Sequence, residues 1–250
     1  MFAKDSKKRH EIMNAAITGA TKGIGYAIAR VFAAEGFNLA VTARSEADLA
    51  AWREVFRRDF PQCQLLALAA DLSDKAQAQS FARQTREAFP AIDVLVNNAG
   101  LFRSGPILSE ADEAMEEMMA VNLFAPYYIC KLLAPALIGQ PRAHIFNICS
   151  SASRQALPGK GAYGVTKGAL LALTQALRLE LRKQQVRVTA VLPGPTWSAS
   201  WEGAELPPER LMPAEDLARA IWSAWAMAPT TVVEEILLQP MEGDLGEEAG

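Results

Sequence analysis

The feature that most constrains the fold is the alternation of short apolar runs with longer amphipathic stretches, which continues along almost the whole chain. A short apolar run bounded by turn residues is typical of a buried strand, and apolar residues at a period of 3.6 are typical of a helix that covers a sheet. Strands and helices in alternation form βαβ units around a parallel sheet. The sequence therefore predicts the α/β class, with a doubly wound parallel sheet flanked by helices.

This pattern predicts seven strands and six helices. The strands are expected at Ala15–Thr18, Leu39–Ala43, Leu65–Ala69, Val94–Asn97, His144–Cys149, Arg187–Leu192 and Glu234–Gln239. The helices are expected at Ile24–Glu35, Glu46–Asp59, Lys75–Phe89, Ala111–Ile138, Ala162–Lys183 and Pro213–Ala228. Ser45 followed by Asp48 resembles a capping box, and Ser73 is expected to cap the helix that follows it.

Nothing divides the chain internally, since it has no repeat, no low-complexity tract and no Pro/Gly linker. One domain is therefore predicted for residues 13–250, after a disordered leader of residues 1–12 that lacks the apolar core of a signal peptide. The least regular stretch runs from Pro193 to Pro213 and carries Trp197 and Trp201. A loop of that length in a compact domain is usually functional.

Charge and hydropathy argue against nucleic acid and membrane as partners. The net charge is −3 and the basic residues are scattered. The longest apolar runs, such as Leu65 to Ala70, have the length of a strand and are far too short to span a bilayer. Three widely spaced cysteines make neither a disulfide framework nor a CxxC motif, which favours buried thiols in the cytoplasm. With two histidines in the chain, a metal-free mechanism is expected.

A glycine-rich turn, TGATKGIG at 18–25, joins the first expected strand to the first expected helix. A pyrophosphate needs backbone N–H donors that no side chain obstructs, and a helix N-terminus supplies such donors with a positive dipole end. A glycine-rich turn that binds nothing has the same local pattern, but its position at the start of a βαβ fold favours dinucleotide binding. The expected contacts are Gly19, Thr21, Lys22, Gly23, Ile24 and Gly25.

The second expected strand ends in Arg44 and Ser45, where a dinucleotide fold faces the adenosine ribose. An acidic residue there would accept from the ribose hydroxyls of NAD, and none is present. Arg44, with Lys22 nearby in the glycine-rich turn, would instead attract a 2′-phosphate, by roughly 4 kcal/mol for a unit charge pair at ~4 Å in a dielectric of about 20. A solvated surface arginine is the alternative. The residues favour NADP (NADPH) over NAD.

Three further segments at strand ends complete the expected cofactor site. After the third strand, Asp71 meets the adenine edge or, alternatively, caps the next helix. The NNAG run at 97–100 holds neighbouring strands together and leaves room for the cofactor ribose, and PGPT at 193–196 shapes a nicotinamide pocket; ordinary turns are the competing interpretation for both. The residues expected to contact the cofactor are Asp71, Leu72, Asn98, Ala99, Gly100, Pro193, Gly194 and Thr196.

Ser150 follows the fifth expected strand, and Tyr163 and Lys167 lie four residues apart on the next helix, hence on one face. A free phenol has a pKa near 10. A fixed lysine ammonium, together with a positive nicotinamide ring, is expected to lower the Tyr163 pKa towards the working range. Tyr-x-x-x-Lys alone also fits an exposed helix pair. Its conjunction with Ser150 and the glycine-rich turn predicts carbonyl reduction, with Tyr163 as proton donor and Ser150 bonded to the substrate oxygen.

Asn122 interrupts a long apolar helix. A buried asparagine satisfied by a neighbouring backbone group is one interpretation. The other is a water-holding link in a proton relay through Lys167. The residues alone support both equally.

Together these motifs resemble the short-chain dehydrogenase/reductase family, from about Asn14 to Leu245. The resemblance implies a Rossmann-type fold and a homodimer or homotetramer. It implies that Lys167 also binds the nicotinamide ribose, with Tyr163 beside the cofactor. The catalytic tetrad that it implies is Asn122, Ser150, Tyr163 and Lys167.

Within the family, the segments LMPAED at 211–216 and TVVEEILLQPMEGDL at 231–245 are similar to bacterial sepiapterin reductase-like members. The expected substrate is a small carbonyl or alcohol compound, and sepiapterin-like pterins are one candidate. Similarity to 3-oxoacyl-carrier-protein reductases rests on shared motifs, and the segment from Trp197 to Glu209 is net acidic rather than basic. A non-catalytic NADP-binding sensor or scaffold is the alternative of another class, although Tyr163 and Lys167 are both present.

Overall fold

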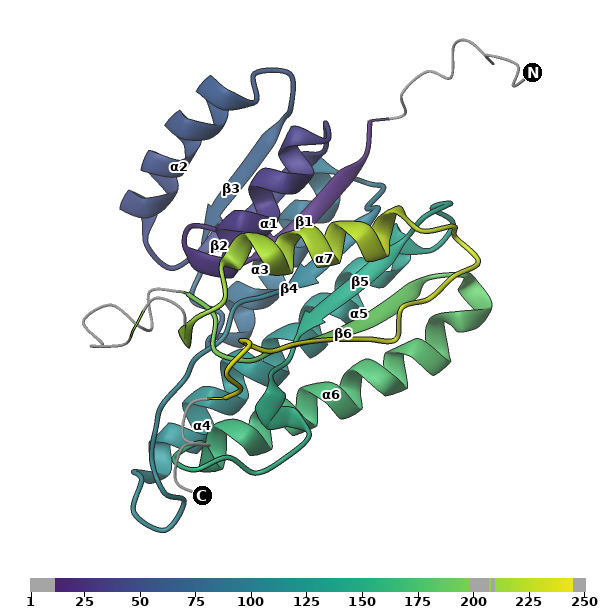
Figure 1. The fold of residues 1–250 in the computed structure, drawn as a ribbon. Helices are drawn as coiled ribbons and strands as arrows, with labels where there is room; N and C mark the ends of the chain where they lie inside the picture. Colours follow the sequence, from purple (N-terminus) through teal and green to yellow (C-terminus); the bar gives the residue numbers. More distant parts are fainter. Residues whose placement is uncertain (1–11, 198–206, 208–209, 245–250) are drawn as a thin grey trace.

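The computed structural model describes residues 12–197, 207 and 210–244 (Figure 1). Its strands form one parallel sheet in the order β3-β2-β1-β4-β5-β6-β7. The strands are β1 (Asn14–Thr18), β2 (Asn38–Ala43), β3 (Leu65–Ala69), β4 (Val94–Asn97), β5 (His144–Ile148), β6 (Arg187–Pro193) and β7 (Glu235–Leu238). The predicted seven-stranded parallel sheet is confirmed, with each strand close to its expected bounds.

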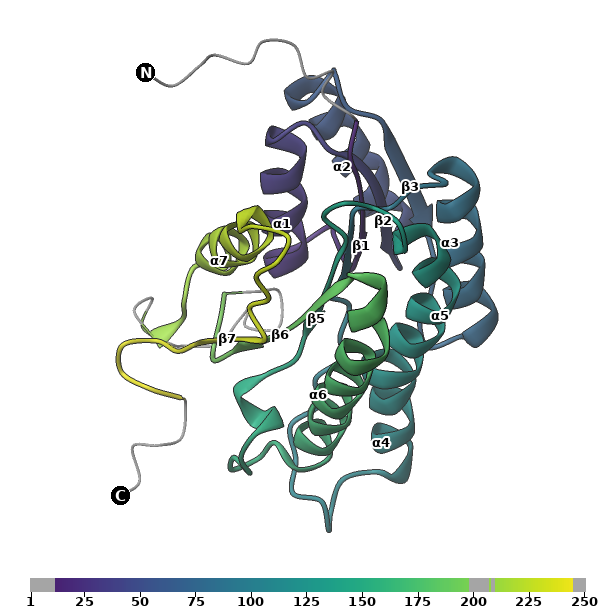
Figure 2. The same cartoon turned by 90° about the vertical axis from the view of Figure 1, so that its right-hand side faces the viewer.

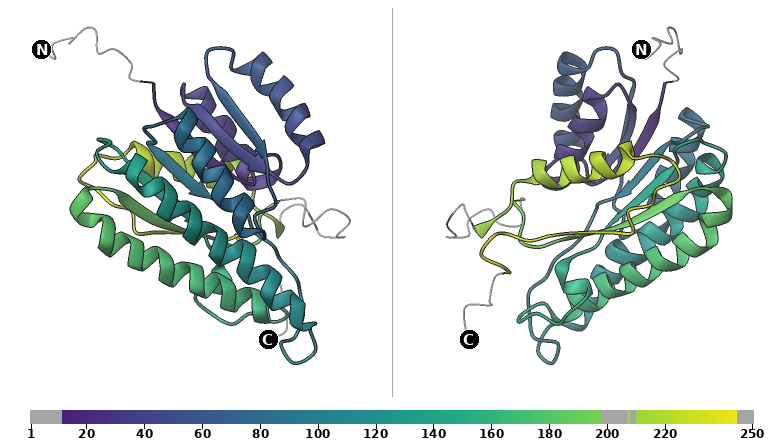
Figure 3. Two further views of the ribbon diagram at one scale, coloured as in Figure 1. Left: turned by 180° about the vertical axis from the view of Figure 1, so that it is seen from behind. Right: turned by 45° about the vertical axis from the view of Figure 1, so that its right-hand side comes forward.

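Helices cover both faces of this sheet. They are α1 (Gly23–Ala34), α2 (Glu46–Asp59), α3 (Lys75–Ala88), α4 (Asp112–Met119), α5 (Ala125–Leu137), α6 (Gly161–Leu181) and α7 (Ala214–Ala226). Figure 2 shows α1 and α7 on one side of the sheet and α3, α5 and α6 on the other. Seen from behind, the second group lies in front of the strands (Figure 3).

The core follows the two-residue period of the strands. In β1, Ala15 and Ile17 pack with α1 and α7, whereas Ala16 packs with α3 and α5 on the opposite face. The chain turns outward from β1 towards β2 and β3, and after β4 it proceeds towards the other edge. Such a reversal opens a crevice at the carboxyl ends of β1 and β4, where ligands of doubly wound sheets bind.

Two helix starts test the capping predictions. Ser45 caps α2, because its hydroxyl accepts a hydrogen bond from the Asp48 N–H at 3.1 Å. The prediction for Ser73 is wrong: α3 is capped by Asp74, whose carboxylate accepts from the Gln77 N–H at 2.9 Å. The Ser73 hydroxyl is instead donated to Asp71, at 2.7 Å.

The single helix expected from 111 to 138 is three segments. A π-helical turn, Ala120–Phe124, separates α4 from α5 and contains the fully buried Asn122. By length and composition alone, Asp112–Leu137 is long and apolar enough to cross a membrane. The expectation that no segment is long enough to do so, which considered only uninterrupted apolar runs, missed this stretch. Here it packs as a core helix, with Ile129 and Leu133 fully buried beside α3.

The loop between β6 and α7 is tied together at its two ends. The Trp197 N–H donates to the Met212 carbonyl at 2.9 Å, and the Met212 N–H donates to the Pro195 carbonyl at 2.9 Å. Trp201, Glu202 and most of the acidic stretch up to Glu209 lie outside the described residues, as does the leader up to residue 11.

Candidate active site

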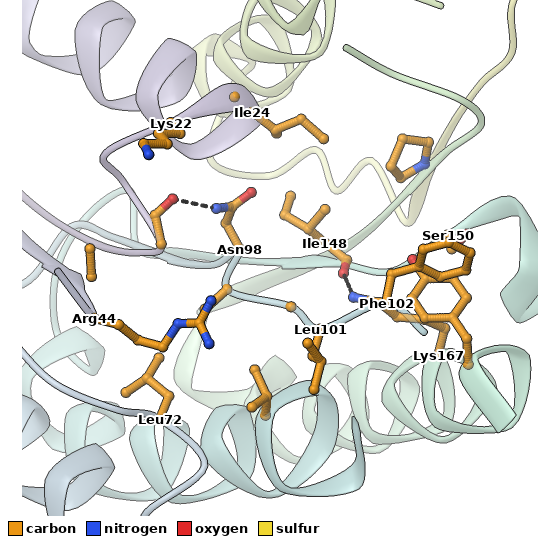
Figure 4. Close-up of a pocket in the computed structure, with 18 of the residues that line it drawn as sticks. Lys22, Ile24, Arg44, Leu72, Asn98, Leu101, Phe102, Ile148, Ser150 and Lys167 are labelled. Atoms are coloured by element: carbon orange, nitrogen blue, oxygen red, sulfur yellow. Dashed lines mark hydrogen bonds between the residues drawn. The ribbon is translucent and has the colours of Figure 1, made fainter. Parts of the chain in front are cut away.

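A cavity of about 710 Å³ runs along the carboxyl edge of the sheet. This volume suits a cofactor together with a small ligand. Its walls come from the loops after six strands, from the start of α6, and from α4 and the π-helical turn after it. The lining segments are Gly19–Ile24 without Ala20, Thr42–Ser45 with Asp48, Ala70–Ser73, Asn98–Arg103, Ile148–Ser151, Pro193–Thr196, Glu117 and Val121, and Lys160, Tyr163 and Lys167 on or beside α6. Figure 4 shows Lys22 and Arg44 towards one end of this cavity and Ser150, Phe102 and Lys167 towards the other.

The glycine-rich turn has the backbone that phosphate binding requires. Gly19 and Gly23 adopt positive φ angles of 66° and 55°, a region that favours glycine. The α1 N-cap, Lys22, makes no side-chain capping bond, which leaves the first-turn N–H donors of α1 without a side-chain acceptor. Gly25 does not line the cavity; a Cβ there would overlap the Gly19 carbonyl and the Asn98 amide, so its role is close packing of turn and helix.

Asn98 fixes this turn from the neighbouring strand. Its amide donates to the carbonyls of Thr18 and Gly19, both at 2.9 Å, and its backbone N–H donates to the Thr18 hydroxyl at 3.0 Å (Figure 4). Asn97 donates to the Asn147 side chain of β5 at 2.8 Å. The prediction that these asparagines hold neighbouring strands together is confirmed.

The end of the cavity that is lined by Lys22 and Arg44 carries two cations and an acid. Lys22, Arg44 and Ser45 line the cavity as predicted, and Asp48 lines it as well. The Asp48 carboxylate lies 3.3 Å from the Lys22 ammonium. From the sequence, Asp48 was expected only to help cap α2. The missed signal is its position: a residue in the first turn of a helix that Ser45 caps can face the same cavity as Ser45.

Asp71 and Leu72 also line the cavity. The Asp71 carboxylate accepts from the Ser73 N–H at 2.9 Å and from the Ser73 hydroxyl, and these bonds hold the Asp71 pKa below its usual value. Asp71 therefore stabilises the turn that precedes α3 through its two hydrogen bonds with Ser73, while Asp74 caps that helix.

Ser150, Tyr163 and Lys167 lie together at the end of the cavity opposite Lys22 and Arg44 (Figure 4), which we call the chemical end. Ser150 and Tyr163 both line the cavity here, and Ser150 is near enough to act on the Tyr163 pKa. The Lys167 ammonium donates to the Ile148 carbonyl at 2.8 Å and lies 5.8 Å from the centre of the Tyr163 ring. Phe102, which the sequence did not single out, packs edge-on against Tyr163 with ring centres 4.9 Å apart.

Burial governs the ionisation of this group. It raises the pKa of Tyr163 to about 12, and Ser150 opposes that rise only in part. Burial also lowers the pKa of Lys167 to about 8. The expected lowering required a positive nicotinamide ring as well as Lys167; among the protein groups alone, burial disfavours the phenolate and the phenol pKa rises. The group that titrates nearest to neutral pH is Lys167.

Asn122 lies behind the cavity wall and not in it. Its side chain accepts from the Leu101 N–H at 2.8 Å and donates to the Leu101 carbonyl and the Thr166 hydroxyl, both at 2.9 Å. Its Oδ1 and the Lys167 Nζ each lie 3.4 Å from where a Cβ of Gly100 would be. Asn122 thus has the backbone partner that the structural interpretation requires and also lies near Lys167.

The last predicted segment, after β6, contributes Pro193, Gly194 and Thr196 to the cavity. The Thr196 hydroxyl donates to the Gly194 carbonyl at 2.9 Å, which leaves its oxygen free to accept. A Cβ at Gly194 would overlap the end of the Gln239 side chain, so the C-terminal segment crosses close to this turn.

Comparison with known proteins agrees with this geometry. The family model described as short chain dehydrogenase matches residues 13–205. A sepiapterin reductase from Chlorobaculum tepidum is 33% identical over 241 residues, covering 93% of this chain and 98% of that protein. An alcohol dehydrogenase from Thermococcus sibiricus, solved with 5-hydroxy-NADP, superposes with a TM-score of 0.85 at 28% identity, covering 92% of this chain and 97% of the other. The L-sorbose reductase of Gluconobacter frateurii, solved with NADPH and L-sorbose, gives 0.84 at 25% identity, covering 94% and 97%.

Proposed function

The chain belongs to the short-chain dehydrogenase/reductase family, and from that premise we propose that it is an NADPH-dependent reductase of a small carbonyl compound. The observation that carries the proposal is the meeting of Ser150, Tyr163 and Lys167 in the cavity that also holds the glycine-rich turn. A nucleotide fold without this group would bind a cofactor and have no residue to move a proton.

The chain's own residues fit NADP. Gly19, Gly23 and the open N-terminus of α1 supply backbone donors for a pyrophosphate, and Lys22 and Arg44 supply charge for a 2′-phosphate. Solved relatives named with NADP or NADPH support the same cofactor. When bound, the nicotinamide supplies the hydride. The other predicted cofactor contacts that line the cavity are Thr21, Ile24, Ser45, Asp71, Leu72, Asn98, Ala99, Gly100, Pro193, Gly194 and Thr196.

The remaining chemistry is proton transfer by side chains. Ser150 hydrogen-bonds to the substrate oxygen and holds it beside the Tyr163 hydroxyl, which donates its proton as charge develops on that oxygen. Lys167, with a pKa of about 8, exchanges protons near neutral pH and restores the phenol. Asn122 holds the loop at Gly100 and Leu101 beside Lys167. A water between Asn122 and Lys167 would complete a proton relay to solvent.

The substrate side of the cavity favours a small, partly apolar carbonyl compound. Phe102, Val121 and Pro195 give apolar surface, while Lys160 and Ser151 give polar groups. A bicyclic pterin such as sepiapterin combines both characters, and a curated relative carries that activity in its name.

We also propose a homo-oligomer in the cytoplasm. Phe124, Tyr127 and Leu179 are exposed apolar side chains on the π-helical turn, α5 and α6. Cys130 and Cys149 are buried, and burial raises their pKa values to about 12 and about 11, as suits thiols that stay reduced. Sedimentation analysis tests the assembly, and a strictly monomeric protein would contradict it.

Tyr163→Phe tests the function directly. We expect the variant to lose at least a thousandfold in turnover of whichever ketone, aldehyde, quinone or pterin the wild type reduces, because the proton donor is gone. NADPH affinity, measured by fluorescence titration, is expected to stay nearly unchanged. Tyr128→Phe, at a half-buried tyrosine of α5 that does not line the cavity, is the matched control. Wild-type turnover in Tyr163→Phe would disprove the assignment.

A further inference from the structure

The C-terminal segment Gln239–Asp244 ends in a buried acid beside the chemical end. Asp244 is 1% exposed. One of its carboxylate oxygens accepts from the Ser151 hydroxyl at 2.7 Å, and the other accepts from the Lys160 ammonium at 2.8 Å. A carboxylate is buried at this depth only where cations and donors compensate it. The arrangement is therefore a built contact and not an incidental surface pair.

The two partners of Asp244 are close in sequence to Ser150, which holds the substrate oxygen, and to Tyr163, which donates the proton. Ser151 follows Ser150 directly, on the loop after β5. Lys160 is the residue before α6, three positions ahead of Tyr163, and it lines the cavity. One carboxylate thus joins the loop that carries Ser150 to the helix start that carries Tyr163.

The rest of the segment is held at the same place. Gln239 and Pro240 lie against Gly194, closely enough that a Cβ on Gly194 would overlap the Gln239 side chain. The Arg210 guanidinium donates to the Glu242 carbonyl at 3.1 Å and to the Asp244 carbonyl at 3.4 Å. The position of Asp244 is accordingly fixed from the loop after β6 as well as from its own side chain.

We propose that Asp244 is a positioning residue, which clamps the Ser150 loop to the start of α6 and so sets how Ser150 and Tyr163 lie relative to one another for proton transfer. This inference rests on the proposed function. It assigns a role to a residue that is far in sequence from both the glycine-rich turn and the Tyr-x-x-x-Lys pair.

The clamp also places a negative charge near the phenol. The charged and titratable groups around Tyr163 are Lys167 on its own helix, Cys149 at the end of β5, and Asp244 with its partner Lys160. The Asp244 charge disfavours the phenolate. Removing that charge should move the pH dependence of kcat towards lower pH, a shift that a purely structural contact would not produce.

Asp244→Asn tests the clamp, with Glu180→Gln as the control. Asparagine keeps the shape and one acceptor oxygen, so one tie remains; we expect kcat to fall about tenfold, less than the roughly hundredfold that a 1 Å misplacement can cost. The NADPH dissociation constant should stay within about twofold, and the kcat–pH profile should move to lower pH. Glu180 is an exposed acid near the far end of α6, and its variant should match the wild type in all three measurements.

Ser151→Ala covers the case in which Asp244→Asn fails to fold. It removes one tie and keeps the charge, so kcat should fall without a displaced pH profile. If both folded variants keep wild-type kcat and pH dependence while Tyr163→Phe is inactive, the clamp is wrong and the proposed function stands. If Tyr163→Phe is active, the proposed function itself has failed.

Discussion

Asp48 puts a carboxylate beside Lys22 and Arg44 at one end of the cavity. Its oxygen lies 3.3 Å from Lys22, and both side chains are well exposed, at 36% and 57%. An exposed ion pair of this kind contributes little to stability. Its consequence concerns the ligand, because the pair holds the Lys22 ammonium while adding a charge that repels a 2′-phosphate.

We expect Asp48→Asn to tighten NADPH binding about fivefold, from roughly 1 kcal/mol of relieved repulsion, and to leave NADH binding unchanged. Arg44→Asp should act in the opposite sense and weaken NADPH much more than NADH. Fluorescence titrations with both cofactors at two salt concentrations measure these effects, and salt should diminish them. Weaker NADPH binding in Asp48→Asn would mean that the acid serves to position Lys22.

Among the elements, the π-helical turn between α4 and α5 is the least regular. It occurs where Asn122 faces Leu101 and Thr166. The Asn122 side chain is fully buried and makes three hydrogen bonds with these two residues. The bulge widens the helix by one residue there, and π-bulges of this kind are frequent at functional sites. The amide thus links the α4–α5 stretch to the loop after β4 and to α6.

Asn122→Ala should destabilise the protein by about 3 kcal/mol, because it removes the three hydrogen bonds of a fully buried side chain and leaves the Leu101 N–H without its acceptor. Urea unfolding measures the change. Phe124→Ala, at a half-exposed position of the same turn, is the comparison and should cost less than half as much. Equal losses would show that the turn responds to helix propensity and not to the amide.

The elements were largely predictable from sequence because each carries its period locally. β3 and α2 have the bounds that their patterns predict. The π-helical turn was not predictable, since it depends on Leu101 and Thr166, which are distant in sequence from Asn122. The same reason explains why Asp48, Phe102 and Asp244 were missed at the site: each acquires its role through a tertiary contact. The rise in the Tyr163 pKa among the protein groups was not foreseen, because it comes from burial, which the sequence does not state.

Across the whole molecule, the site carries a cost in stability through Lys167. Its side chain is buried, 3% exposed, and burial lowers its pKa from the usual 10.5 to about 8. At pH 7 the folded protein must hold this charge away from water. The lowered Lys167 pKa corresponds to a cost of roughly 3 kcal/mol in the free energy of unfolding. Between about pH 8 and 10.5 the unfolded chain binds more protons than the folded one, so this cost disappears as pH rises.

Lys167→Met should therefore stabilise the protein at pH 7 while abolishing turnover. The expected gain is about 2 kcal/mol, since removal of the buried charge is offset in part by loss of the hydrogen bond to the Ile148 carbonyl, worth about 1 kcal/mol. At pH 10 the gain should vanish or reverse, because the wild-type lysine is then neutral when folded. Denaturant unfolding at the two pH values measures the difference. Lys131→Met, at an exposed lysine of α5, should show no such pH dependence, and a Lys167→Met variant that is less stable at pH 7 would contradict the cost assigned to the buried ammonium.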